Sequence, residues 1–160
     1  MFTFKLLLLA VTLALSPPVN DSDPAPNFEF YHEKGEVQEL RDYGGKVVYI
    51  SFWASWCKPC LSNYQKYSEM RKELQEMGVV LLNVSMDKDK NSWERALKSY
   101  SFLNGENVHV TDLRKVMELY ELTVIPEYRI LNKNQEEVYL DQEKGRDVMS
   151  SFKSWVDSPK

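Results

Sequence analysis

The stretch that decides the fold is GGKVVYISFWASWCKPC, residues 44–60. Its middle part, residues 46–53, is rich in β-branched and aromatic residues, which is typical of a strand buried on both faces of a sheet. A Cys-x-x-Cys pair, Cys57 and Cys60, follows this run. Pro59 favours the start of a helix, because its missing N–H would have no partner in the first turn. The stretch therefore predicts a buried strand followed by a helix, with two thiols at the junction.

The segments around this stretch predict strands that alternate with helices. A long helix is expected over residues 59–77, where apolar residues recur at helical spacing until Gly78 ends the helix. The other expected elements are a hairpin of 28–30 and 36–40, a strand at 79–86, a helix at 91–100, a strand at 108–110, a helix capped by Thr111 or Asp112 and ending near residue 121, a hairpin of 127–131 and 136–140, and a helix at 145–156. This order predicts an α/β protein with a central mixed sheet and helices on both faces.

Composition and charge exclude several classes of protein. The 160 residues are enough for one domain, and an apolar content of 43% excludes a disordered chain. The chain has 20 Lys and Arg against 24 Asp and Glu, a net charge of −4, so we expect no nucleic-acid partner. We expect a monomer.

The amino-terminal residues predict export. Residues 1–16, MFTFKLLLLAVTLALS, contain Lys5 and then ten residues without charge, the length of a signal-peptide core and too short for a spanning helix. An uncleaved membrane anchor is the alternative. Residues 17–27 are rich in proline and polar residues and predict a linker, which leaves residues 28–160 as the folded domain. The domain is therefore expected in the periplasm or cell envelope, where disulfides persist.

The position of the two thiols predicts redox chemistry. Cys57 is expected exposed at the start of the helix, where backbone N–H groups and the helix dipole stabilise a thiolate, and Lys58 adds a cation. Cys60, more enclosed and one turn further on, is placed to resolve a mixed disulfide formed by Cys57. The spacing alone is also compatible with half a metal site or a small structural disulfide.

A family resemblance strengthens the redox interpretation. FWASWCKPC resembles the active site of the thioredoxin superfamily. Together with VVLLNVSMD and LTVIPEYRIL, it is similar to the TlpA/ResA-like family of exported thiol-disulfide oxidoreductases, over residues 28–156. The resemblance implies a thioredoxin-like fold in which residues 88–111 supply an additional helix and strand. It also implies that the Cys57–Cys60 disulfide works without a bound cofactor.

The resemblance assigns supporting roles around the thiols. Ile125-Pro126 matches a proline with a cis peptide bond that lies against the Cys-x-x-Cys pair, leaving the backbone of Ile125 free to pair with an extended substrate. Trp53 is expected in the core beneath the site, and Trp56 at the surface beside the thiol.

Three residues depart from the family pattern. Ser51 stands where thioredoxins have a buried Asp, Asn63 where ResA-like proteins have a Glu, and Gln65 where many relatives have a Pro. A hydroxyl and an amide do not titrate near neutral pH. Loss of the Cys60 proton is therefore expected to rely on water or on a carboxylate elsewhere, which predicts slow resolution of the mixed disulfide.

Three functions are compatible with these features. The favoured one is an exported reductase of protein disulfides, for example in cytochrome c maturation, kept reduced by a membrane-bound thiol reductant. A disulfide oxidase or isomerase is the alternative. A metal chaperone using the thiols with His32 or His109 is less favoured, because metal-ligand spacing is absent. A peroxidase is disfavoured, because Cys57 lies in a Cys-x-x-Cys pair and not in a Thr-x-x-Cys pocket.

Overall fold

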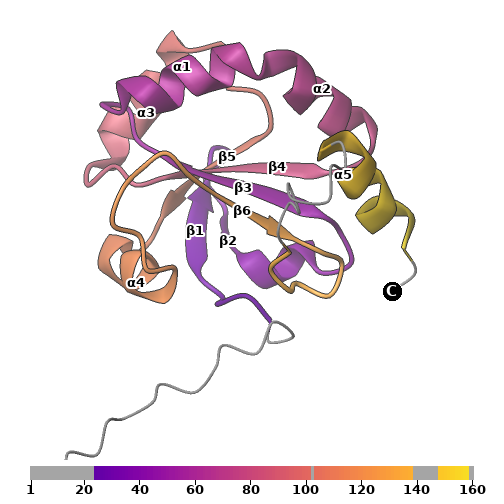
Figure 1. Ribbon diagram of the computed structural model, residues 1–160. Helices are drawn as coiled ribbons and strands as arrows, with labels where there is room; N and C mark the ends of the chain where they lie inside the picture. The colour runs from indigo at the N-terminus through magenta and orange to yellow at the C-terminus, as the bar shows by residue number, and fades with distance from the viewer. Residues whose placement is uncertain (1–23, 102, 139–147, 159–160) are drawn as a thin grey trace, which may run out of the picture.

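One mixed sheet forms the centre of the protein (Figure 1). A computed structural model describes residues 24–101, 103–138 and 148–158. Within these residues the strand order is β2-β1-β5-β4-β3-β6. The strands are β1 (Glu29–His32), β2 (Val37–Glu39), β3 (Val48–Trp53), β4 (Val80–Ser85), β5 (Glu106–Val110) and β6 (Glu127–Leu131). The expected mixed α/β architecture is confirmed.

Strand β3 is an interior strand of this sheet and lies between β4 and the last strand in the order, β6. It pairs in parallel with β4 and antiparallel with β6, so both of its edges are hydrogen-bonded. Its side chains alternate between the two faces, as a strand requires. Val48, Ile50 and Phe52 face a large apolar cluster, and Trp53 faces the opposite layer. The strand predicted from residues 46–53 is therefore present, and it is buried on both faces.

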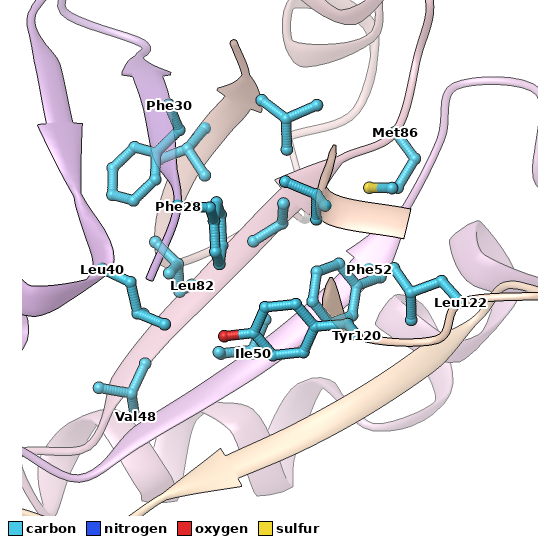
Figure 2. Packing of buried hydrophobic residues seen from close by; sticks show 14 of the residues in the cluster. Phe28, Phe30, Leu40, Val48, Ile50, Phe52, Leu82, Met86, Tyr120 and Leu122 are labelled. Carbon is cyan, nitrogen blue, oxygen red and sulfur yellow. The ribbon is translucent and has the colours of Figure 1, made fainter. Parts of the chain in front are cut away.

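Helices cover both faces of the sheet (Figure 1). The described helices are α1 (Lys58–Lys66), α2 (Ser68–Glu76), α3 (Lys90–Ser99), α4 (Leu113–Leu119), α5 (Val148–Asp157) and the 3₁₀ helix η1 (Leu40–Tyr43). Helices α1, α2, α3 and α5 lie on one face, and η1 and α4 on the other. Figure 2 shows the second layer, in which Phe28 and Phe52 pack around Tyr120 at ring-centroid distances of 5.6 and 5.3 Å.

The single helix predicted over residues 59–77 is wrong, because the chain forms two helices with a break at Tyr67. Tyr67 has φ −104° and ψ 20°, outside the helical range. Helix α1 packs on the cluster that contains the disulfide, whereas α2 packs through Leu74 on a separate cluster with Phe152. The break therefore separates two helical segments that pack on different apolar clusters. No proline or glycine occurs near Tyr67, and the apolar spacing continues across it, so the sequence does not predict the break.

Other boundaries differ from the sequence expectation in small ways. Strand β1 pairs with β2 as predicted, and also antiparallel with β5. Strand β5 begins two residues earlier than expected, and Asp112 caps α4 by accepting a hydrogen bond from the Lys115 N–H. Of the second strand of the hairpin, predicted at 136–140, the described residues 136–138 form only isolated bridges, at Glu136 and Glu137.

Several sequence predictions fall on residues that the structure does not describe. These are the signal peptide at 1–16, the linker up to residue 23, the end of the last predicted strand at 139–140, and the first residues of the closing helix at 145–147. Residues 24–27 are described and contact the domain, since the Tyr120 hydroxyl donates to the Pro26 carbonyl at 2.7 Å. In the described part of the chain, no helix has the length and apolar character that crossing a bilayer requires.

Gly105 provides a test of the fold. It adopts φ +104°, and a Cβ atom there would lie 2.5 Å from the Leu81 carbonyl oxygen. We expect Gly105→Ala to lower the free energy of unfolding by about 3 kcal/mol, from steric conflict plus left-handed strain. Gly35→Ala is the matched control, because Gly35 has φ +89° but no neighbour within 4 Å, and it should lose only about 1 kcal/mol. Equal losses in urea unfolding would contradict the predicted close approach.

Candidate active site at the Cys57–Cys60 disulfide

Cys57 and Cys60 form a disulfide at the start of α1, with Cα atoms 5.3 Å apart. Cys57 is the N-cap residue, and its Sγ accepts a hydrogen bond from the Cys60 N–H at 3.2 Å. The helix begins at Lys58, so Pro59 is its second residue. The expectation that Cys57 is exposed is wrong for this oxidised form, since Cys57 and Cys60 are 3% and 1% exposed. Both sulfurs pack into an apolar layer below the loop.

The two tryptophans near the thiols lie where the sequence predicts. Trp53 is fully buried, and its ring packs edge-on against Tyr64 with centroids 6.0 Å apart. Trp56 is 68% exposed and lies beside Cys57 in the chain. Trp53 thus supports the disulfide from below, and Trp56 provides an apolar surface next to it.

The peptide bond between Ile125 and Pro126 is cis, as predicted. Ile125 packs against the cluster that contains both cysteines, which places the cis-proline segment beside the disulfide. Among the described residues, no hydrogen bond engages the backbone of Ile125. Val124, just before it, is 67% exposed. This segment therefore offers unpaired backbone groups next to the thiols.

A groove of about 700 Å³ opens beside this segment. It lies between the loop that follows β3, the loop that follows β4, helix α4 and the cis-proline segment. Its apolar lining comes mainly from Trp56, Met86, Leu113, Met117, Leu122, Val124 and Ile125. Trp56, the chain neighbour of Cys57, and Ile125, which packs on the cluster with both cysteines, line the groove, so it opens beside the disulfide.

Asp87 is a site residue that the sequence analysis missed. Its carboxylate is 2% exposed and accepts hydrogen bonds from the Ser55 N–H, the Ser55 hydroxyl and the Ser85 hydroxyl at 2.9, 2.7 and 2.9 Å. It therefore holds the loop that leads into Cys57. The signal was present, because Asp87 follows a strand parallel to β3 and such strands end at the same edge of a sheet.

A polar row across the sheet was also missed. Ser51, Asn83 and Asn107 pair on β3, β4 and β5, beneath α1 and α2. Arg71 of α2 enters this row with 2% exposure, and its guanidinium donates to Asn83 Oδ1 at 2.7 Å and to Ser51 Oγ at 3.4 Å. The position that carries a buried acid in thioredoxins therefore contacts a buried cation here.

Asn63 and the two histidines form contacts with residues other than the cysteines. The Asn63 side-chain amide donates to the Tyr128 hydroxyl at 3.0 Å. His109 Nε2 lies 2.8 Å from the Asp87 carbonyl oxygen, and its ring packs on Trp93. His32 lies 3.7 Å from Glu106, away from the cluster around the disulfide. In the described ranges, no three His, Cys, Asp or Glu side chains are grouped to hold a metal ion.

Comparisons with known proteins establish the family. The model of the AhpC/TSA family matches residues 22–139, so the chain belongs to this family. ResA thiol-disulfide oxidoreductases are similar to it: the Bacillus subtilis (strain 168) protein is 30% identical over 114 residues, and the Geobacillus kaustophilus (strain HTA426) protein is 30% identical over 112. These matches cover 71% and 70% of this chain and 63% of each relative. The chain thus spans less than two thirds of the length of these curated relatives.

Solved structures confirm the thioredoxin-like fold. A Bacteroides vulgatus protein described as a thiol-disulfide oxidoreductase is 28% identical, with a TM-score of 0.70 over 82% of this chain and 94% of its own. The thioredoxin domain of another Bacteroides vulgatus thiol-disulfide oxidoreductase shares 22% identity and the same fold, with a TM-score of 0.67 over 72% of this chain and 84% of its own. The resemblance to ResA-like proteins is confirmed.

The contacts of Asp87 predict a graded loss of stability. Asp87→Ala removes the acceptor of three hydrogen bonds and should lower the free energy of unfolding by about 3 kcal/mol, since bonds to a charged group contribute about 1.5–3 kcal/mol each but are partly replaced by water. Ser85→Ala removes one of the three bonds and should cost about 1 kcal/mol. Chemical denaturation checks both values. An Asp87→Ala protein as stable as the Ser85→Ala protein would show that Asp87 does not hold the loop.

Proposed function

We propose that the protein is an exported thiol-disulfide oxidoreductase that reduces disulfides of cell-envelope proteins through Cys57 and Cys60. The observation that carries the proposal is the Cys-x-x-Cys disulfide at the N-terminus of α1, beside a cis-proline segment. The similarity to ResA thiol-disulfide oxidoreductases supports it.

The geometry supports a two-step exchange. In the reduced protein, the Cys57 thiolate attacks one sulfur of a client disulfide, and the other client sulfur leaves as a thiolate. The attacking Cys57 thiolate is stabilised by the N-terminus of the helix and by the backbone N–H of Cys60, which lies 3.2 Å from the Cys57 sulfur. Cys60 then attacks the Cys57 sulfur and releases the second client thiolate. The client gains two electrons, and the protein returns to its disulfide.

The client would lie along the surface next to Cys57. Trp56 and the apolar groove offer contact area, and the backbone of Ile125, held by the Ile125-Pro126 bond, pairs with an extended segment. Lys58 and Pro59 complete the loop, and Lys58 supplies a nearby cation. No cofactor or metal takes part in this cycle.

The direction, place and partners complete the proposal. Pro59 as the second intervening residue favours reduction, with oxidation or isomerisation as the alternative. Residues 1–16 direct export, residues 17–27 form a linker, and residues 28–160 form the thioredoxin-like domain. In an oxidising compartment a membrane-bound thiol reductant must return two electrons per cycle, and an apocytochrome c with paired cysteines is a fitting client.

Trapping tests the assignment of the two thiols. Cys60→Ser should accumulate a mixed disulfide with a model disulfide protein, because Cys57 attacks but nothing resolves the product. Cys57→Ser, the matched control, should accumulate little. Non-reducing gels and intact-mass measurement distinguish the two. If Cys57→Ser traps the client and Cys60→Ser does not, the roles are reversed.

The reduction potential tests the direction. Equilibration with thiol-disulfide buffers should place the Cys57–Cys60 pair nearer the thioredoxin value of about −270 mV than the DsbA value of about −120 mV. A strongly reducing pair gives its electrons to client disulfides. A value near the DsbA end would establish a disulfide donor and overturn the proposed reduction.

A further inference from the structure

Arg71 places a positive charge in the layer between the sheet and helices α1 and α2. Its guanidinium donates to neutral acceptors: Asn83 Oδ1 at 2.7 Å, the Asn104 carbonyl at 2.9 Å, Asn104 Oδ1 at 3.0 Å and Ser51 Oγ at 3.4 Å. Among the described residues, no carboxylate forms an ion pair with it. A guanidinium keeps its proton in proteins. The charge is therefore buried and not neutralised.

The sheet is built to hold this cation. The Asn83 side-chain amide donates to Asn107 Oδ1 at 3.0 Å and to the Asn104 carbonyl at 2.9 Å, which orients its own oxygen toward Arg71. Burying an unpaired charge is costly unless hydrogen bonds satisfy it, and here three backbone or amide oxygens do so. Several buried polar groups thus bind one arginine, which points to a role beyond packing.

Tyr64 connects the cation to the disulfide. The Arg71 Cζ lies 4.5 Å from the centroid of the Tyr64 ring. Tyr64 follows Cys60 by one helical turn and packs with it and with Trp53 in one apolar cluster. Burial raises the pKa of the Tyr64 phenol, so the ring is neutral and does not cancel the charge. The space between the guanidinium and the Cys60 sulfur is thus filled by protein, where water screens poorly.

We infer that Arg71 is a positioning residue for the dithiol, whose buried charge stabilises the Cys60 thiolate. The kinetic consequence rests on the proposed exchange activity. In the resolving step, the Cys60 thiol releases its proton to water, its sulfur bonds to the Cys57 sulfur, and the bond between Cys57 and the client breaks. The client sulfur leaves as a thiolate and takes a proton from water. Arg71 thereby serves in place of a nearby carboxylate, by making water a sufficient proton acceptor.

Other titratable groups surround the cysteines and Arg71 from several elements. Asp87 has its carboxylate oxygens bound by Ser55 and Ser85. The remaining groups are Cys57, Lys58 and Tyr64 of the α1 region, Tyr100 after α3, His109 of β5 behind Trp93, and Tyr49 of β3 and Tyr128 of β6 near Arg71. A substitution at Arg71 removes none of these groups, and a variant that keeps the charge controls for movement of Tyr64 and Tyr49, which pack on the guanidinium.

The test measures the pKa of Cys60 directly. In full-length Cys57→Ser protein Cys60 is the single thiol, because the chain has two cysteines. Its thiolate is followed by ultraviolet absorbance against pH. Adding Arg71→Gln should raise the Cys60 pKa by about one unit, the size of shift expected when one side chain, Tyr64, separates a buried unit charge from the thiolate in a protein interior. Arg71→Lys, which keeps the charge, should shift it less.

Asn104→Asp separates charge from packing. It keeps the side-chain shape and the contact with Arg71, but places a carboxylate against the guanidinium. The Cys60 pKa should rise here too, whereas Ser51→Ala, which removes only a hydroxyl, should leave it near its starting value. If Arg71→Gln does not fold, Asn104→Asp tests the inference in its place. Thermal unfolding shows whether each variant is folded.

Kinetics in the protein with both cysteines complete the test. The pH midpoint of mixed-disulfide resolution should move upward with the Cys60 pKa, making Arg71→Gln about tenfold slower below that midpoint. An unchanged Cys60 pKa in folded Arg71→Gln and Asn104→Asp proteins would overturn the inference. A shifted pKa in a protein whose parent reduces no disulfide would support the inference and overturn the proposed function.

Discussion

Strand β3 is hydrogen-bonded on both edges and covered on both faces, and the rest of the structure depends on this burial. A strand without a solvated face needs apolar layers above and below it, which α1 and α2 provide on one side and η1 and α4 on the other. The chain leaves β3 at its carboxyl end, after Trp53. Cys57 lies at that exit, where the free N–H groups of α1 meet the loop held by Asp87.

The layer beneath the disulfide is apolar around the cysteines and contains one buried cation, Arg71. Trp53 and Tyr64 exclude water around the cysteines, and Arg71 lies directly behind Tyr64. The same exclusion of water that makes Arg71 costly to bury gives its charge influence over a distance of several ångströms. Stability and thiol chemistry are therefore linked through the same side chains, so substitutions in the polar row must be judged on both.

Much of the candidate site could be predicted because its signals are local. The Cys-x-x-Cys spacing, the helix start at Pro59 and the burial of Trp53 follow from residues next to one another in the chain, and the cis bond at Ile125-Pro126 followed from family resemblance. Asp87 and Arg71 were missed for a different reason. Their contacts join residues 32 and 20 positions apart, and only strand register and helix docking bring these together.

The sequence by itself determined the strand–helix order, the mixed sheet and the two thiols at the start of a helix, because periodicity and capping act over a few residues. The tertiary structure decided the break at Tyr67, the enclosure of Cys57 and the alignment of Ser51 with Asn83 and Asn107. These depend on how the sheet twists and on which side chains compete for one buried layer. Ser51, within an apolar run, does not indicate that a buried arginine contacts it. Arg71 lies 20 positions later in α2, and only the packing of that helix on the sheet brings the two side chains together.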